Sequence, residues 1–368
     1  MSDSFIPLGR PDITEGDISA VIKVLRSGQL IQGECVRELE SDFSAYTGTT
    51  SAIAVSNGTA TLHLALRVLD IGPGDEVIVP AFSYIATANV VELVGAKPVF
   101  VDIDLPTFNL DANQLEQAIS IRTKAIIPVH EFGLCCDIEA ICRIAKKRGI
   151  PVIEDAACAL GATQRDKQAG SFGLLGSFSL HPRKSITSGE GGVLVTDDAA
   201  LSAKLRQLRN HGIEMLEGKM QFSEAGFNYR MTDFQAALAH NQFQRFNEIL
   251  QYKKELAKIY FSEIRHSDIR LPKVPSDRLH TWQTFHLLLP PGMDQYRTIE
   301  RLKEKNIGTN YGAQCIPAQE FYRRKYGEDA AVLYPRAFTA FSRGLAIPLY
   351  ERLRKEDAHY IAQIINQL

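Results

Sequence analysis

Short apolar strands alternate with helical stretches between residues 50 and 200, and this alternation constrains the fold more than any other feature. Helical patterns occupy residues 59–70 and 137–149. Seven segments rich in Val and Ile and bounded by Gly, Pro or Asp are predicted strands: 51–56, 76–80, 97–104, 124–130, 151–157, 176–181 and 192–198. This order predicts an α/β fold with a mostly parallel seven-stranded sheet covered by helices on both faces.

The chain of 368 residues is too long for one compact core, so we expect two domains. After residue 230 the pattern changes to one or two long helices over 232–263. A smaller mixed segment follows, with strands expected in 280–290 and 344–350. We therefore predict a large domain over 1–245 that holds the site, and a smaller C-terminal α/β domain over 246–368.

Composition excludes several classes of protein. The chain is 45% hydrophobic and 23% charged with a net charge of −2, which gives no electrostatic reason for binding nucleic acid or an anionic membrane. It has no apolar run long enough to span a bilayer and no signal peptide, so we expect a cytoplasmic protein. The six cysteines lack paired C-x-x-C spacing, so we expect free thiols and no metal site.

Polar residues follow several of the predicted strands, at the edge where such sheets bind ligands. Gly58, Thr59 and Ala60 open the helix after the first strand. Free N–H groups and the positive end of the helix dipole favour a phosphate there, and Gly58 permits close approach. A plain helix-capping role for Thr59 is the alternative.

Asp155 ends the strand 151–157 between apolar neighbours, so its carboxylate is predicted to be poorly solvated. It needs a cationic partner such as a protonated pyridine nitrogen, or else it is a hydrogen-bonded structural acid. Lys184 lies in a loop rich in Ser, Thr and Gly between the last two strands. Neighbouring Arg183 would favour the neutral amine that a Schiff base requires, although a loop lysine taken alone is usually structural.

Two further sites surround this lysine. Ser179, five residues before Lys184, can offer a hydroxyl to a phosphate. Asn228 and Arg230 precede the long helix that Thr232 or Asp233 caps, where polar side chains can project into a cleft. A capped loop with a surface arginine is the alternative reading of that segment.

Together and in this order, these sites resemble the DegT-type nucleotide-sugar aminotransferases of fold-type I pyridoxal 5′-phosphate (PLP) enzymes. The resemblance covers nearly the whole chain and includes IPLGRPDI, VSNGTATLHLAL, PAFSY, EDAACALGA, SFSLHPRKSITSGEGG and FNYRMTDFQAA. It implies an aspartate-aminotransferase-like fold and a homodimer whose active sites are shared between subunits.

The resemblance also implies residue roles. Lys184 would hold PLP through a Schiff base and shuttle the reacting proton, and Asp155 would pair with the pyridinium nitrogen. The other expected cofactor contacts are Gly58, Thr59, Ala60, Tyr84, Cys158, Ser179 and Asn228, with Asn228 acting in the neighbouring subunit's site. His181, Arg230 and Tyr311 are the expected substrate contacts.

The implied reaction moves the amino group of L-glutamate to a nucleotide-linked 3- or 4-keto deoxy sugar, for lipopolysaccharide, O-antigen or other glycan biosynthesis. A PLP-dependent dehydratase would have histidine at position 184, which disfavours that reading. An aminotransferase of a cyclitol or another ring, and a non-catalytic sensor with this fold, stay as alternatives.

Two departures from the family pattern bear on the site. Cys158 stands where the family usually has a glutamine that bonds the cofactor's 3′ oxygen, and a thiol is a weak donor. The segment 308–322, which contains Tyr311 and is expected to line the sugar pocket, also differs from the usual pattern.

Overall fold

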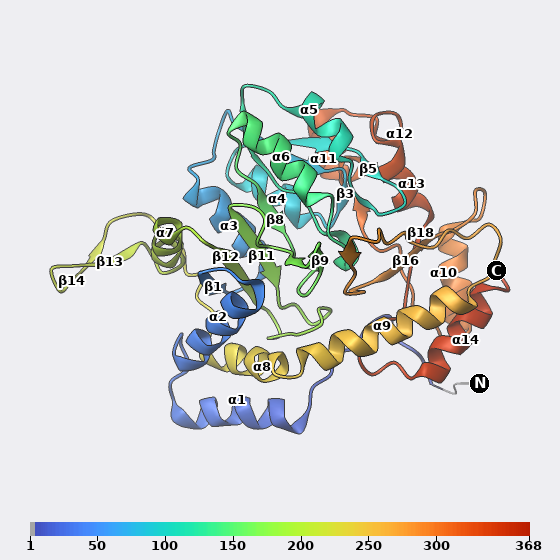
Figure 1. Ribbon diagram of the computed structural model, residues 1–368, viewed down its shortest axis with the longest axis horizontal. Helices are drawn as coiled ribbons and strands as arrows, with labels where there is room; N and C mark the ends of the chain where they lie inside the picture. The colour runs from blue at the N-terminus through green and yellow to red at the C-terminus, as the bar shows by residue number, and fades with distance from the viewer. Residues whose placement is uncertain (1–3) are drawn as a thin grey trace.

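The computed structural model describes residues 4–368 (Figure 1). It contains the predicted seven-stranded sheet, in which isolated bridges join a four-stranded and a three-stranded part. Six of the seven strands are one to four residues shorter than their predicted ranges, and Asp102 divides the range 97–104 into two strands. From one edge to the other they run β1 (Ser51–Val55), β12 (Gly192–Thr196), β11 (Leu175–Ser179), β8 (Ile153–Asp155), β7 (Thr123–Ile126), β2 (Glu76–Pro80) and β4 (Lys97–Val101). Only β12 is antiparallel to its neighbours, so the sheet is mostly parallel as predicted.

Helices cover both faces of this sheet because successive strand residues point to opposite sides. Along β1, Ile53 and Val55 join the core under α3 (Gly58–Val68), α4 (Ala86–Leu93) and α7 (Ala199–Arg209). Ala52 and Ala54 face the opposite core. That side is covered at one end by α2 (Glu34–Thr47) and α8 (Asp233–Phe243), and at the other by α5 (Leu115–Ala118) and α6 (Ile138–Arg148).

The long helical region predicted over 232–263 is two helices, α8 and α9 (Phe246–Glu263), separated by a turn. Thr232 caps α8 in a capping box with Gln235. Asp233, the other predicted cap, accepts hydrogen bonds from Gly33 N and Val36 N instead and so holds the start of α2. Helix α1 (Glu15–Ser27) packs against α8.

The C-terminal part forms its own core around α9. Its antiparallel strands β16 (Phe285–Leu288) and β18 (Gly344–Ile347) fall inside the two predicted ranges. Helices α10 (Gln295–Glu304) and α14 (Lys355–Ile365) complete this core, whereas α13 (Pro335–Arg343) packs with Ala337 and Ala340 in the core of the large sheet. Helix α9 is shared, since its first turns pack on the large sheet's core and its later turns on the second core. The boundary at residue 245 stays a prediction.

The remaining helices and strands are short. Two of these strands form the β13–β14 hairpin, which projects from the body (Figure 1). The remaining elements are β3 (Phe82–Ser83), β5 (Ile103–Asp104), β6 (Asn109–Leu110), β9 (Thr163–Gln164), β10 (Lys167–Gln168), β13 (Ile213–Leu216), β14 (Lys219–Phe222), β15 (Arg278–Leu279), β17 (Gln314–Cys315), α11 (Glu320–Tyr326) and α12 (Ala330–Leu333). Within residues 4–368, no helix is both long and apolar enough to cross a membrane.

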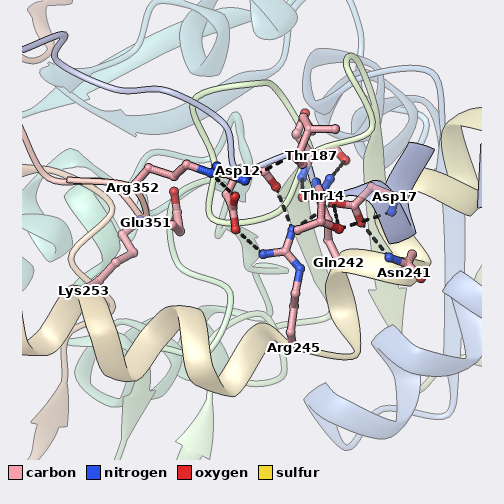
Figure 2. Close-up of polar contacts among 11 residues, drawn as sticks. Asp12, Thr14, Asp17, Thr187, Asn241, Gln242, Arg245, Lys253, Glu351 and Arg352 are labelled. Atoms are coloured by element: carbon pink, nitrogen blue, oxygen red, sulfur yellow. Dashed lines mark hydrogen bonds and ion pairs between the residues drawn. The ribbon is translucent and has the colours of Figure 1, made fainter. Parts of the chain in front are cut away.

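Charged side chains join the N-terminal segment, the start of α9 and the C-terminal part (Figure 2). Asp17 is fully buried and accepts hydrogen bonds from Arg245 (2.9 Å) and Asn241 (2.7 Å). Arg245 also pairs with Asp12, and Asp12 pairs in turn with Arg352 of the C-terminal part. These pairs tie the two cores together beside the turn between α8 and α9.

Arg245→Met is expected to lower the free energy of unfolding by about 2–4 kcal/mol, because it leaves the buried Asp17 carboxylate without its cation. The matched control Arg37→Met removes an exposed pair with Glu34 and should cost less than about 1 kcal/mol. Urea unfolding followed by circular dichroism measures both variants. Equal losses in the two variants would contradict the prediction.

Candidate active site

The carboxyl ends of β1, β8 and β11 open into a cavity of about 740 Å³. Helix α3 and the loop after β11 form its other walls. Eight of the residues predicted from the sequence line it, namely Gly58, Thr59, Tyr84, Asp155, Cys158, Ser179, His181 and Lys184. Residues separated by more than 120 positions along the chain therefore meet at one edge of the sheet, as the parallel arrangement requires.

Asp155 is buried at the end of β8 in the floor of this cavity. Its carboxylate accepts hydrogen bonds from Thr87 Oγ1 (2.8 Å) and Ala157 N (3.2 Å). Burial raises the pKa of Asp155, and these two bonds limit the rise. The acid is therefore well placed to hold a cation inside the cavity.

The preceding residue, Glu154, has a different role. It is fully buried and accepts hydrogen bonds from His130 (2.8 Å) and from the backbone N–H groups of Gly170, Phe172 and Gly173. His130 Nδ1 accepts from Cys136 N, so its Nε2 carries the proton donated to Glu154. Glu154 is thus the structural acid of the pair, and it holds β7, β8 and the loop before β11 together.

The Lys184 amine donates a hydrogen bond to the Cys158 thiol at 2.9 Å within the same cavity. Burial alone lowers the pKa of this amine, but its hydrogen bond to Cys158 and the nearby Asp155 carboxylate raise that pKa above its usual value. Burial also raises the pKa of Cys158, which keeps it a thiol. The amine is therefore protonated. A cationic ligand that pairs with the Asp155 carboxylate would lower the pKa of the amine and favour its neutral form.

The start of α3 forms a cradle for an anion. Asn57 caps the helix and accepts a hydrogen bond from Ala60 N (2.8 Å), so Thr59 is not the cap. Within the described chain, the N–H groups of Gly58 and Thr59 have no hydrogen-bond acceptor. Side chains are excluded at Gly58, where a Cβ would lie 2.8 Å from Ser179 Cβ. These N–H groups and the Ser179 hydroxyl suit a phosphate.

Tyr84 and His181 also face the cavity. The Tyr84 ring is 66% exposed, so it is available to cover a ligand. Burial lowers the pKa of His181, and the nearby Lys184 and Arg183 cations lower it further. A neutral imidazole can still donate a hydrogen bond to a substrate.

Four predicted residues do not line the cavity. Ala60 is buried in α3, and its N–H donates to the Asn57 cap. Asn228 is exposed, and Arg230 donates a hydrogen bond to Asn210 Oδ1 at 2.6 Å. Tyr311 is half-exposed and packs edge-on against Phe341. Their predicted contacts with cofactor and substrate stay predictions.

The sequence reasoning did not identify three residues of this site. Thr87 binds Asp155, and Glu131 is buried in the cavity wall directly after the predicted strand 124–130. Glu131 could have been found by the same rule that identified Asp155, namely a polar residue at the carboxyl end of a strand. Lys253 is fully buried on α9 and had no local signal in the sequence.

A second, smaller cavity continues from the first toward the C-terminal part. The two share Tyr84, Glu131, Cys158, Arg183 and Lys184 in their walls. The far wall contains Arg10, Lys253, Asn310, Tyr350 and Glu351. A ligand bound in the main cavity at the sheet edge can therefore contact a second ligand bound in the smaller cavity, which lies toward the C-terminal part.

The site fits PLP on three observations. The buried carboxylate at position 155 forms no ion pair among residues 4–368, Lys184 supplies an amine to the same cavity, and the helix start offers free N–H groups to a phosphate. Among residues 4–368, no cluster of three His, Cys, Asp or Glu side chains could hold a metal ion. Fold and site together define a fold-type I PLP-dependent enzyme.

The comparisons with known proteins agree with this class. Residues 11–366 match the model of the DegT/DnrJ/EryC1/StrS aminotransferase family, and the chain belongs to that family. It is 41% identical over 340 residues to the UDP-4-amino-4-deoxy-L-arabinose–oxoglutarate aminotransferase of Shewanella sediminis, with 89% of this chain and 87% of that protein covered. The chain is thus a PLP-dependent aminotransferase.

Solved structures show the same fold over the whole chain. A Streptococcus pneumoniae protein assigned as a sugar aminotransferase and solved in its PLP form superposes with a TM-score of 0.93 at 32% identity, covering 99% of this chain and 98% of that one. A 3-amino-5-hydroxybenzoic acid synthase superposes with a TM-score of 0.91 at 28% identity, covering 98% of each chain.

Borohydride reduction of the PLP-loaded protein is expected to fix the cofactor on Lys184, because this amine lies in the cavity that contains Asp155. Peptide mass spectrometry locates the label. Lys184→Ala should lose it, whereas Lys253→Ala, which removes the other buried lysine, should keep it. A label on Lys253 in the unaltered protein would refute the assignment.

Proposed function

We propose that this aminotransferase moves the amino group of L-glutamate to the keto carbon of a nucleotide-linked deoxy sugar, at carbon 3 or carbon 4. One observation carries the proposal, which is that the cavity holding Lys184 and Asp155 continues into a second cavity with a basic mouth. The relative from Shewanella sediminis, whose name describes an aminotransferase of this type, supports it.

The basic mouth suits an anionic substrate. Arg10 and Arg183 are exposed in the wall of the second cavity, whereas the buried Lys253 in that wall is paired with Glu351. Guanidinium groups bind phosphate and carboxylate oxygens bidentately. These cations therefore match both a nucleotide diphosphate and the carboxylates of L-glutamate.

PLP supplies an electron sink that stabilises negative charge on the carbon bearing the transferred nitrogen. The protein residues manage protons and orientation. Lys184 Nζ carries the proton between the cofactor's C4′ carbon and the substrate carbon, and Asp155 keeps the ring nitrogen protonated. His181 and Arg230 are the proposed contacts for the donor carboxylate, and Tyr311 for the sugar.

The reaction can be tested in reverse with UDP-4-amino-4-deoxy-L-arabinose and 2-oxoglutarate. Formation of L-glutamate, measured by mass spectrometry, is the expected result, and Lys184→Ala should abolish it because it removes the proton carrier. Asp155→Asn should lose most activity for lack of a counter-charge. A screen of other nucleotide-linked 3- and 4-keto sugars with L-glutamate follows if this sugar is inert.

The similarity to 3-amino-5-hydroxybenzoic acid synthase favours one second candidate, an aminotransferase of a ring that carries no nucleotide. Keto cyclitols in the same screen distinguish the two. Turnover of a cyclitol with no turnover of any nucleotide-linked sugar would replace the proposal by this candidate.

We propose further that the site is completed by a second copy of the chain. Asn228 is exposed and lies away from the cavity of its own chain, in the segment that leads into α8. The neighbouring β13–β14 hairpin projects from the body and exposes Met215, Met220 and Phe222. Exposed apolar side chains of this kind mark protein interfaces.

Mixing two inactive variants tests the shared site. In a symmetric dimer, Lys184→Ala and Asn228→Ala together should regain about a quarter of wild-type activity after random subunit exchange, because each mixed dimer has one intact site. If Asn228 serves its own chain's site, the mixture stays inactive. Each variant re-mixed with itself is the control.

A further inference from the structure

Glu131 has an unpaired carboxyl oxygen in the wall of the active-site cavity. The residue is 5% exposed and lines both the main and the second cavity. Its Oε2 atom has no hydrogen-bond partner among residues 4–368. Since an unpaired buried polar atom costs about 1–3 kcal/mol, a ligand that bonds Glu131 would recover this energy.

The backbone of Glu131 is fixed on one side of Asp155. His130 N donates a hydrogen bond to the backbone oxygen of Asp155 at 3.0 Å, and Glu131 N donates one to Asn109 Oδ1 at 2.9 Å. Glu131 thus follows β7, whereas Ser179 ends β11, and β8 with Asp155 lies between these two strands. The phosphate cradle and Glu131 are therefore on opposite sides of Asp155.

The arrangement of groups around the PLP ring indicates which of them would lie nearest Glu131. The aldehyde carbon is para to the ring nitrogen, and it is flanked on one side by the phosphate arm and on the other by the 3′ oxygen. If Asp155 bonds the ring nitrogen, Lys184 the aldehyde carbon and the cradle beside β11 the phosphate, the 3′ oxygen would face the β7 side, where Glu131 lies.

We propose that Glu131 donates a hydrogen bond to the 3′ oxygen of the cofactor and so sets the position of the ring. Cys158 shares this region of the wall, but its sulfur already accepts the Lys184 amine at 2.9 Å. A thiol is also a weak donor. The carboxyl group of Glu131 is the stronger donor on this side of the cavity.

The charge state of Glu131 agrees with a donor role. Burial and the neighbouring Asp155 raise the pKa of Glu131 to about 8, although Ser83, Lys184 and the Phe132 N–H group lower it in part. The raised pKa favours the protonated carboxyl group at neutral pH. A neutral acid donates its proton to the 3′ oxygen, whereas an ionised one would repel it.

Two substitutions at this position separate bonding from packing. Glu131→Leu removes the donor, and Glu131→Gln keeps a donor of the same size. Titration of apo-protein with PLP should show affinity reduced at least about tenfold in Glu131→Leu and within about threefold of wild type in Glu131→Gln. The visible absorption band of the bound cofactor should shift in the leucine variant only.

A substitution at the neighbouring position provides rescue. Cys158→Gln should change PLP affinity little in the wild-type background, and it should restore affinity to Glu131→Leu, because its amide supplies a donor from the same side. The melting temperature of each apo-protein separates misfolding from lost bonding. If Glu131→Leu does not fold, Glu131→Met, which keeps the side-chain length without a donor, replaces it in both comparisons.

The proposal is overturned if Glu131→Leu binds PLP as tightly as wild type with an unchanged visible band. It is also overturned if Glu131→Gln loses as much affinity as Glu131→Leu, or if Cys158→Gln restores nothing. These readouts involve the cofactor alone, so they are independent of which sugar or donor the enzyme uses.

Discussion

A buried carboxylate in the middle of a parallel sheet is the constraint on which this active site depends. Asp155 ends the central strand β8, where burial disfavours its charge and, among residues 4–368, its carboxylate accepts hydrogen bonds from Thr87 and Ala157 N alone. Such a group is stable as an anion only beside a cation. The cavity above Asp155 also holds the Lys184 amine and the free N–H groups at the start of α3. These groups suit a cofactor with a cationic ring nitrogen, an aldehyde and a phosphate.

The two adjacent acids of β8 illustrate how strand geometry separates structure from function. Because successive side chains point to opposite sides of a strand, Glu154 turns away from the cavity that Asp155 faces. Glu154 is saturated by three backbone N–H groups and His130, which fixes β7 and the loop before β11 against β8. The structural acid thereby holds the functional acid and Glu131 in place before any ligand arrives.

The site also depends on the joint between the two cores. Lys253 lies on the shared helix α9 and donates a hydrogen bond to Ser185, next to Lys184, while pairing with Glu351 of the C-terminal part. The Asp12 and Arg245 pairs hold the same joint from the N-terminal segment (Figure 2). The second cavity, where a substrate would enter, is formed between these elements, so its shape follows from how the two parts are held.

The sequence by itself determined the sheet, its helices, and the residues that end β1, β8 and β11, because hydrophobic periodicity and strand-end polarity are local signals. Family resemblance supplied the cofactor and the roles of Lys184 and Asp155. Only the tertiary structure decided that Asn57 caps α3, that Glu154 is saturated while Glu131 is not, and that Asn228, Arg230 and Tyr311 lie outside the cavity of their own chain. The physical reason is that hydrogen-bond satisfaction and burial depend on partners distant in the sequence, such as Gly170 for Glu154, which no local pattern encodes.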